Sequence, residues 1–95
     1  MATQGSGVGG KSMKAVANDV AEGYMTINPL VLKKFDKSMI KELFEHLNKA
    51  MSAARNIAAP LTDQIAMRNK NMKLQRLHNS IIILRNTARE KRIPL

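Results

Sequence analysis

Residues Ile40–Ile57 carry the pattern that decides the fold, and they read IKELFEHLNKAMSAARNI. Apolar residues recur there at alternating intervals of three and four, at Ile40, Leu43, Leu47, Ala50, Ala54 and Ile57. This spacing places the side chains on one stripe of an α-helix, and Phe44, Met51 and Ala58 widen the stripe. The stretch therefore predicts a long amphipathic helix with one face packed against other helices.

The residues before this stretch predict a tail followed by a first helix. Residues 1–11 hold four of the five glycines and no apolar stripe, so we expect a disordered Gly/Ser-rich tail. From Ser12, a favoured N-cap residue, apolar residues recur with helical spacing, which predicts a helix over residues 12–25. Its stripe consists of Met13, Val16, Ala17, Val20, Ala21 and Tyr24.

Prolines mark both ends of the long central helix. Asn28 is a favoured N-cap and Pro29 suits the first helical position, so the helix is predicted over residues 29–58. Residues 36–38 (Asp-Lys-Ser) interrupt the stripe and indicate either a kink or a new helix start. Pro60 ends the helix because proline lacks a backbone donor and clashes with the carbonyl one turn earlier.

A third helix is predicted over residues 62–91, with Thr62 or Ala59 as its N-cap. Its stripe again has heptad-like spacing, at Met67, Leu74, Leu77, Ile81, Leu84 and Ala88. Two helices of roughly 30 residues, about 45 Å each, joined by a short link at Pro60, predict an antiparallel hairpin. In the alternative geometry the chain bends at Pro60 without reversing and buries the same stripe by dimerisation.

The open end of this hairpin needs a third neighbour. Folding about Pro60 places residues 81–84 opposite residues 35–39, and four consecutive apolar residues cannot all be buried by one helix. The predicted fold class is therefore all-α, a long antiparallel helical hairpin with a short N-terminal helix completing a three-helix bundle at one end. Residues 12–95 form a single domain in this prediction.

Composition excludes several functions. The chain has no cysteine, so disulfides and cysteine-based metal sites are excluded. No segment approaches the roughly 20 apolar residues that span a bilayer, and Met1–Gly10 has no secretory signal pattern. We therefore expect no membrane association and a location in the cytoplasm or the nucleus.

Two patterns resemble reactive sites. Residues 5–12 (GSGVGGKS) match the phosphate-binding loop pattern, but only Met-Ala-Thr-Gln precedes them where a buried strand is required. Glu42 and His46 are one helical turn apart, and the hairpin brings His78 near Glu42, but no further strong metal ligand accompanies them. Neither histidine has a nucleophile at a recognisable spacing. We predict a non-enzyme with no metal, no cofactor and no small-molecule substrate.

Positive charge gathers in the C-terminal part of the chain. Lys and Arg outnumber Asp and Glu by 16 to 7, for a net charge of +9, and residues 60–95 hold eight basic but two acidic residues. The candidate basic surface comprises Arg68, Lys73, Arg76, Arg85, Arg89 and Arg92. Such charge attracts nucleic acid, but Arg68, Lys73, Arg76 and Arg89 point to four separate sectors of their helix, and aromatic residues for base stacking are few. A basic accessory protein that binds RNA or DNA is the alternative function.

The leading hypothesis is a non-catalytic protein–protein interaction or assembly module, such as a small subunit, an adaptor or a chaperone-like hairpin. Its partner is another protein or a second copy of itself, and we expect a homo-oligomer. The candidate interface residues lie on the two long stripes: Leu43, Phe44, Leu47, Met51, Ile57, Met67, Leu74 and Leu77. Seven methionines against three aromatic residues suit adaptable packing surfaces.

Overall fold

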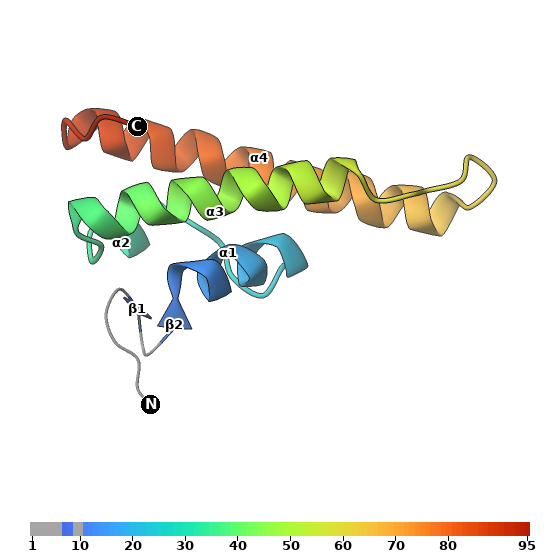
Figure 1. Cartoon of the computed structure of the whole chain (residues 1–95), viewed down its shortest axis with the longest axis horizontal. Coiled ribbons are helices and arrows are strands. Elements are labelled where there is room, and N and C mark those ends of the chain that lie inside the picture. Colours follow the sequence, from blue (N-terminus) through green and yellow to red (C-terminus); the bar gives the residue numbers. More distant parts are fainter. Residues whose placement is uncertain (1–6, 9–10) are drawn as a thin grey trace.

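A computed structural model describes residues 7–8 and 11–95, and it confirms the all-α class (Figure 1). The helices of the described chain are α1 (Met13–Glu22), α2 (Pro29–Leu32), α3 (Lys37–Arg55) and α4 (Gln64–Glu90). Two short strands, β1 (Gly7–Val8) and β2 (Lys11–Ser12), pair antiparallel ahead of α1. The predicted disordered tail lies mostly outside the described residues, so it stays a prediction.

The core lies where three helices meet. α3 and α4 run antiparallel as a hairpin, and α1 packs against both of them on one side (Figure 1). The side chains that are wholly removed from solvent come from all three helices and from the segments between them: Met13, Val16, Val20, Ile27, Leu32, Ile40, Leu43, Leu47, Leu77 and Leu84. The predicted hairpin with a packed N-terminal helix is therefore confirmed.

The register of the hairpin differs from the predicted one. The guanidinium carbon of Arg85 lies 5.7 Å from the centre of the Phe44 ring, so this part of α4 faces the middle of α3. The prediction that residues 81–84 lie opposite residues 35–39 is wrong. Residues 56–63 lie outside the helices, and extended residues advance about twice as far as helical ones. The link therefore covers a longer stretch of α4 than eight helical residues would, and this shifts the pairing of α3 and α4 along the chain.

The central helix is divided. α2 ends at Leu32, and α3 begins after Asp36, whose carboxylate accepts a hydrogen bond from the Met39 amide at 2.8 Å. The break at residues 36–38 is thus a new helix start, and the prediction of one helix over residues 29–58 is wrong. With Asp36 as N-cap, the chain can change direction and begin a new helix in which a free amide of the first turn has a hydrogen-bond partner.

Side-chain caps begin the other helices as well. Ser12 accepts from the Ala15 amide at 3.1 Å and Asn28 accepts from the Val31 amide at 2.9 Å, as the sequence predicts. Helix α4 is capped by Asp63, not by Thr62 or Ala59, through a 3.0 Å bond from the Ala66 amide. Asp63 caps the helix instead of Thr62 or Ala59 because it directly precedes the first turn. Its negative carboxylate also interacts favourably with the positive end of the helix dipole.

Helices α1 and α4 end in the same C-terminal motif. The amides of Tyr24 and Ile93 donate to carbonyls five residues earlier, each at 2.8 Å. In both cases the residue directly before the donating amide has a left-handed backbone. That residue is Gly23 in α1, with φ +84°, and Arg92 after α4, with φ +59°. Helix α1 therefore ends at Glu22 instead of the predicted residue 25, because Gly23 adopts the conformation that closes it.

Replacing Leu47 with aspartate should strongly destabilise the protein, since the side chain is fully buried between helices. The lost apolar burial and the buried charge together should cost more than about 3 kcal/mol, against a total stability of about 5–15 kcal/mol. Thermal melting followed by circular dichroism measures the change. Leu61→Asp, at a residue that is 84% exposed, is the control and should melt like the wild type.

The two left-handed positions should respond in opposite directions. Gly23→Ala should destabilise the protein by about 1–2 kcal/mol, because a Cβ strains the left-handed backbone. Arg92→Gly should stabilise it by about 0.5–1 kcal/mol by relieving the same strain. Urea unfolding measures both changes, and a stabilised Gly23→Ala variant would contradict this account of how α1 ends.

Candidate protein-binding surface at the hairpin tip

The predicted interface residues fall into two groups in the structure. Leu43, Leu47 and Leu77 are fully buried in the core, so they cannot contact a partner while the fold is intact. The others have exposed surface. Phe44, Met51 and Leu74 are partly buried and pack against the core, Met67 is partly buried, and Ile57 is exposed. The structure thus separates the stripe that holds the hairpin together from the residues at its edge.

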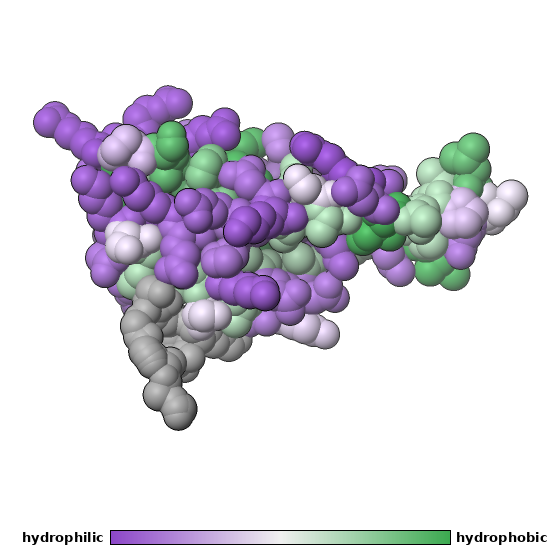
Figure 2. Space-filling model, viewed as in Figure 1, coloured by the Kyte–Doolittle hydropathy of each residue, from purple (hydrophilic) through white to green (hydrophobic). Residues whose placement is uncertain are grey.

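The hairpin tip is the most apolar exposed part of the view in Figure 2, where it protrudes beyond the polar body of the molecule. We define it as residues 56–63 together with the first two turns of α4, residues 64–71. Within it Leu61 is 84% exposed and Ile65 is 74% exposed, and Ile57 lies beside them in the sequence at 38%. Figure 1 shows that α1 packs further along the hairpin, so only the link and the start of α4 make up this end.

Leu61 and Ile65 are the tip residues that sequence reasoning missed. They lie outside the heptad stripes of both long helices, so the search for buried seams passed over them. One signal was present: they are four residues apart, soon after Pro60, and Ile65 lies in the first turn of a helix whose own stripe starts only at Met67. Apolar residues off the stripe at a helix start indicate a surface that its own fold does not cover.

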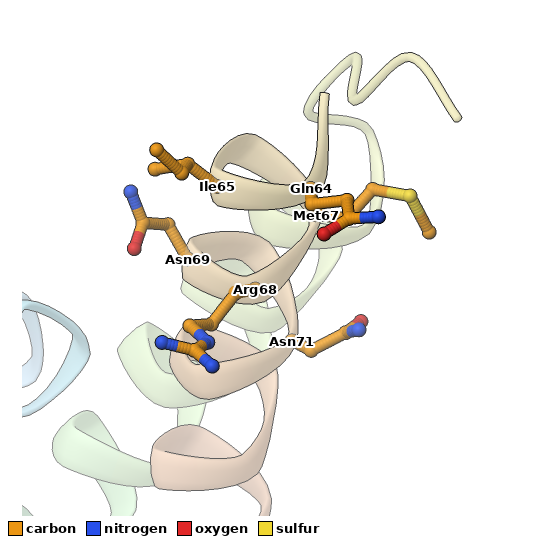
Figure 3. Close-up of a pocket in the computed structure, with 6 residues that line it drawn as sticks. All are labelled: Gln64, Ile65, Met67, Arg68, Asn69 and Asn71. Carbon is orange, nitrogen blue, oxygen red and sulfur yellow. The ribbon is translucent and has the colours of Figure 1, made fainter. Parts of the chain in front are cut away.

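The start of α4 carries an open hollow of about 620 Å³ (Figure 3). Its lining comes entirely from the first two turns: Gln64, Ile65, Met67, Arg68, Asn69 and Asn71. In Figure 3, Ile65 and Asn69 point to one side of the helix, while Met67 and Asn71 point to the other. A hollow lined by one convex helix cannot enclose a small molecule. It suits a partner element that lies along the helix.

Two of the predicted basic-surface residues hold α1 in place. Arg76 donates a hydrogen bond of 3.0 Å to the carbonyl of Ala21, in the last turn of α1. Lys73 forms an ion pair of 3.0 Å with Glu22, the last residue of α1. Cations at a helix C-terminus satisfy free carbonyls and oppose the negative end of the helix dipole. Both residues are partly exposed and also have partners within the fold, and their place in a basic binding surface stays a prediction.

Lys91 plays the same part at α2. Its ammonium donates to the carbonyls of Leu32 and Phe35, at 3.2 Å and 3.4 Å, where α2 ends. Helix α4 and the residue that follows it thus supply cations to the C-terminal ends of both short helices. The positive charge of α4 has a structural use that its sequence alone did not show.

The other four basic candidates are exposed, but in separate places. Arg68 lies at the tip, whereas Arg85 and Arg89 line a second hollow of about 390 Å³ near the C-terminus. Arg92 follows α4 in its left-handed conformation. The structure therefore does not bring the six predicted residues together on one surface.

The metal-like and nucleotide-like patterns find little support. Glu42 and His46 approach to 4.0 Å, whereas His78 lines a hollow with Met51. In the part of the chain that is described, no three His, Cys, Asp or Glu side chains are placed to share a metal ion. The Ser12 hydroxyl caps α1, and most of the rest of the GSGVGGKS match lies outside the described residues. No helix of the described residues is long and apolar enough to cross a membrane.

Arg76→Gln should loosen α1, because a neutral amide replaces the charged donor to the Ala21 carbonyl. We expect a loss of about 1 kcal/mol in stability and faster amide hydrogen exchange within α1. Arg68→Gln, at an exposed position of the same helix, is the matched control and should change stability by less than about 0.5 kcal/mol. Equal effects of the two variants would show that Arg76 does not hold α1.

Comparisons of the chain with protein-family models, with curated proteins and with solved structures found no match. The surfaces described above are therefore the basis for a functional proposal.

Proposed function

We propose that the chain is a non-catalytic protein-binding module whose hairpin tip docks against another protein. The observation that carries this proposal is the exposure of Leu61 and Ile65 at a protruding end of the molecule (Figure 2). Fully burying one such side chain is worth about 1.5–3 kcal/mol, which the isolated chain does not gain. A partner that covers the tip would gain this free energy.

The neighbouring residues add to this surface. Met67 is partly buried and Met72 is 43% exposed, and both are flexible side chains that adapt to the shape of a partner. Asn69 and Asn71 each offer hydrogen-bond donors and acceptors beside the apolar residues. An apolar centre with polar edges is the usual composition of a protein interface.

Nucleic-acid binding is the second candidate, and the second hollow favours it. Arg85 and Arg89 flank Phe44 there, which combines positive charge with an aromatic ring. The Arg85 guanidinium already lies over that ring, however, and a stacked base would have to displace it. We therefore rank this candidate below protein binding. The location in the cytoplasm or nucleus and the predicted homo-oligomer stay predictions.

Leu61→Ser and Ile65→Ser should weaken capture of the partner from native extract while leaving the fold unchanged. Each loses a well-covered interface side chain, which costs roughly 1–3 kcal/mol of binding free energy. Leu30→Ser is the matched control, since Leu30 is 71% exposed but lies in α2, at the opposite end of the hairpin (Figure 1). Affinity capture with quantification of bound protein, combined with thermal melting of each variant, makes the measurement.

Two results would contradict the proposal. The first is a bound protein whose capture falls with Leu30→Ser but not with the tip variants. The second is a complex that nuclease destroys and whose affinity falls steeply with salt, since counterion release steepens the log–log slope by about 0.7–0.9 per phosphate contacted. That second result would favour the nucleic-acid candidate, and Arg85→Gln with Arg89→Gln should then reduce the slope.

A further inference from the structure

We infer that the partner element is an amphipathic helix with acidic residues beside its apolar stripe. This inference rests on the proposed function, and it names the chemistry of what the tip binds. It follows from the charges around Leu61 and Ile65, from the shape of the surface there and from the absence of aromatic residues at the tip.

The rim of the tip is positively charged. On the first two turns of α4, Arg68 is exposed and Lys70 is partly exposed, while Asp63 is the only acidic residue between Glu45 and Glu90. The Asp63 carboxylate is engaged by the Ala66 amide at the positive end of α4. A partner therefore meets an apolar centre with a basic border, and acidic residues complement that border.

A second copy of the chain fits this surface poorly. Two tips in contact would bring the same basic residues of both copies together, on molecules that each carry a net charge of +9. Like charges brought together across an interface oppose association. Charge thus favours an acidic partner over self-association at this end.

Nucleic acid and lipid fit less well than an acidic helix. The three aromatic residues, Tyr24, Phe35 and Phe44, lie outside residues 56–71, so the tip offers nothing on which a base can stack or that anchors at a lipid interface. The surface instead offers two exposed apolar side chains, Leu61 in the link and Ile65 in the first turn of α4. The apolar face of an amphipathic helix that lies along the open hollow of α4 can cover both side chains.

Selection of displayed random peptides of about 16 residues, roughly four helical turns, tests the inference on the full chain. Binders are retained only if they bind the wild type and lose binding to the Leu61→Ser, Ile65→Ser double variant. We expect the retained peptides to combine apolar residues at helical spacing with an excess of Asp and Glu. Binding of synthetic copies is then measured by titration, together with vesicles containing phosphatidylserine and the oligomeric state of the chain.

Charge variants give a second readout on the same peptides. Arg68→Gln and Lys70→Gln should each raise the dissociation constant by about two- to five-fold. Lys37→Gln, an exposed basic residue at the start of α3 and away from the tip, should leave it unchanged. The affinity should also fall as salt is raised.

Any other result would overturn a particular part of the proposal. Retained peptides that are neutral or basic would overturn the acidic partner while leaving the tip as a protein-binding surface. If every peptide that binds the wild type binds the double variant equally well, both the inference and the proposed function are overturned. Tip-dependent binding to the vesicles, or a dimer that the double variant abolishes, would replace the acidic helix by a lipid surface or a second copy.

Discussion

Burial of the apolar stripe of α1 in the groove between α3 and α4 is the interaction on which the rest of the structure depends. Met13, Val16 and Val20 lose all or nearly all of their solvent exposure there. A two-helix hairpin has a single seam, and it would leave one side of each helix open to water. Docking α1 converts the wide end of the hairpin into a three-helix core, in which residues of α3 and α4 also become buried.

Electrostatic contacts set the position of α1 once it is docked. The Arg76 guanidinium and the Lys73 ammonium, both from α4, meet the last turn of α1, where Gly23 gives the chain its left-handed exit. A Cβ at Gly23 would lie 3.0 Å from the Arg76 guanidinium carbon, so the glycine also makes room for this contact. The result is that part of the chain's positive charge contacts α1 and stabilises the fold.

The length difference between the helices creates the candidate site. Helix α1 has 10 residues and is about 15 Å long, whereas α4 has 27 residues and is about 40 Å long. A short third helix can cover only part of such a hairpin. Among the described residues, the start of α4 and the link before it therefore have no third neighbour, and Leu61 and Ile65 keep their exposure there. The same geometry that builds the core thus leaves an apolar end for another molecule.

The elements that depend on local chemistry could be predicted from the residues alone. Helical spacing of apolar residues predicted the hairpin and α1, and the caps at Ser12 and Asn28 followed from residue type, because a cap bonds an amide only three positions away. Three features were decided by the tertiary structure alone: the hairpin register, the structural use of Arg76, and the separation of core from edge among the candidate interface residues. Each depends on how far an irregular link extends or on which helix lies across another. Periodicity along one helix cannot show either, since it identifies an apolar face but not the neighbour that covers it.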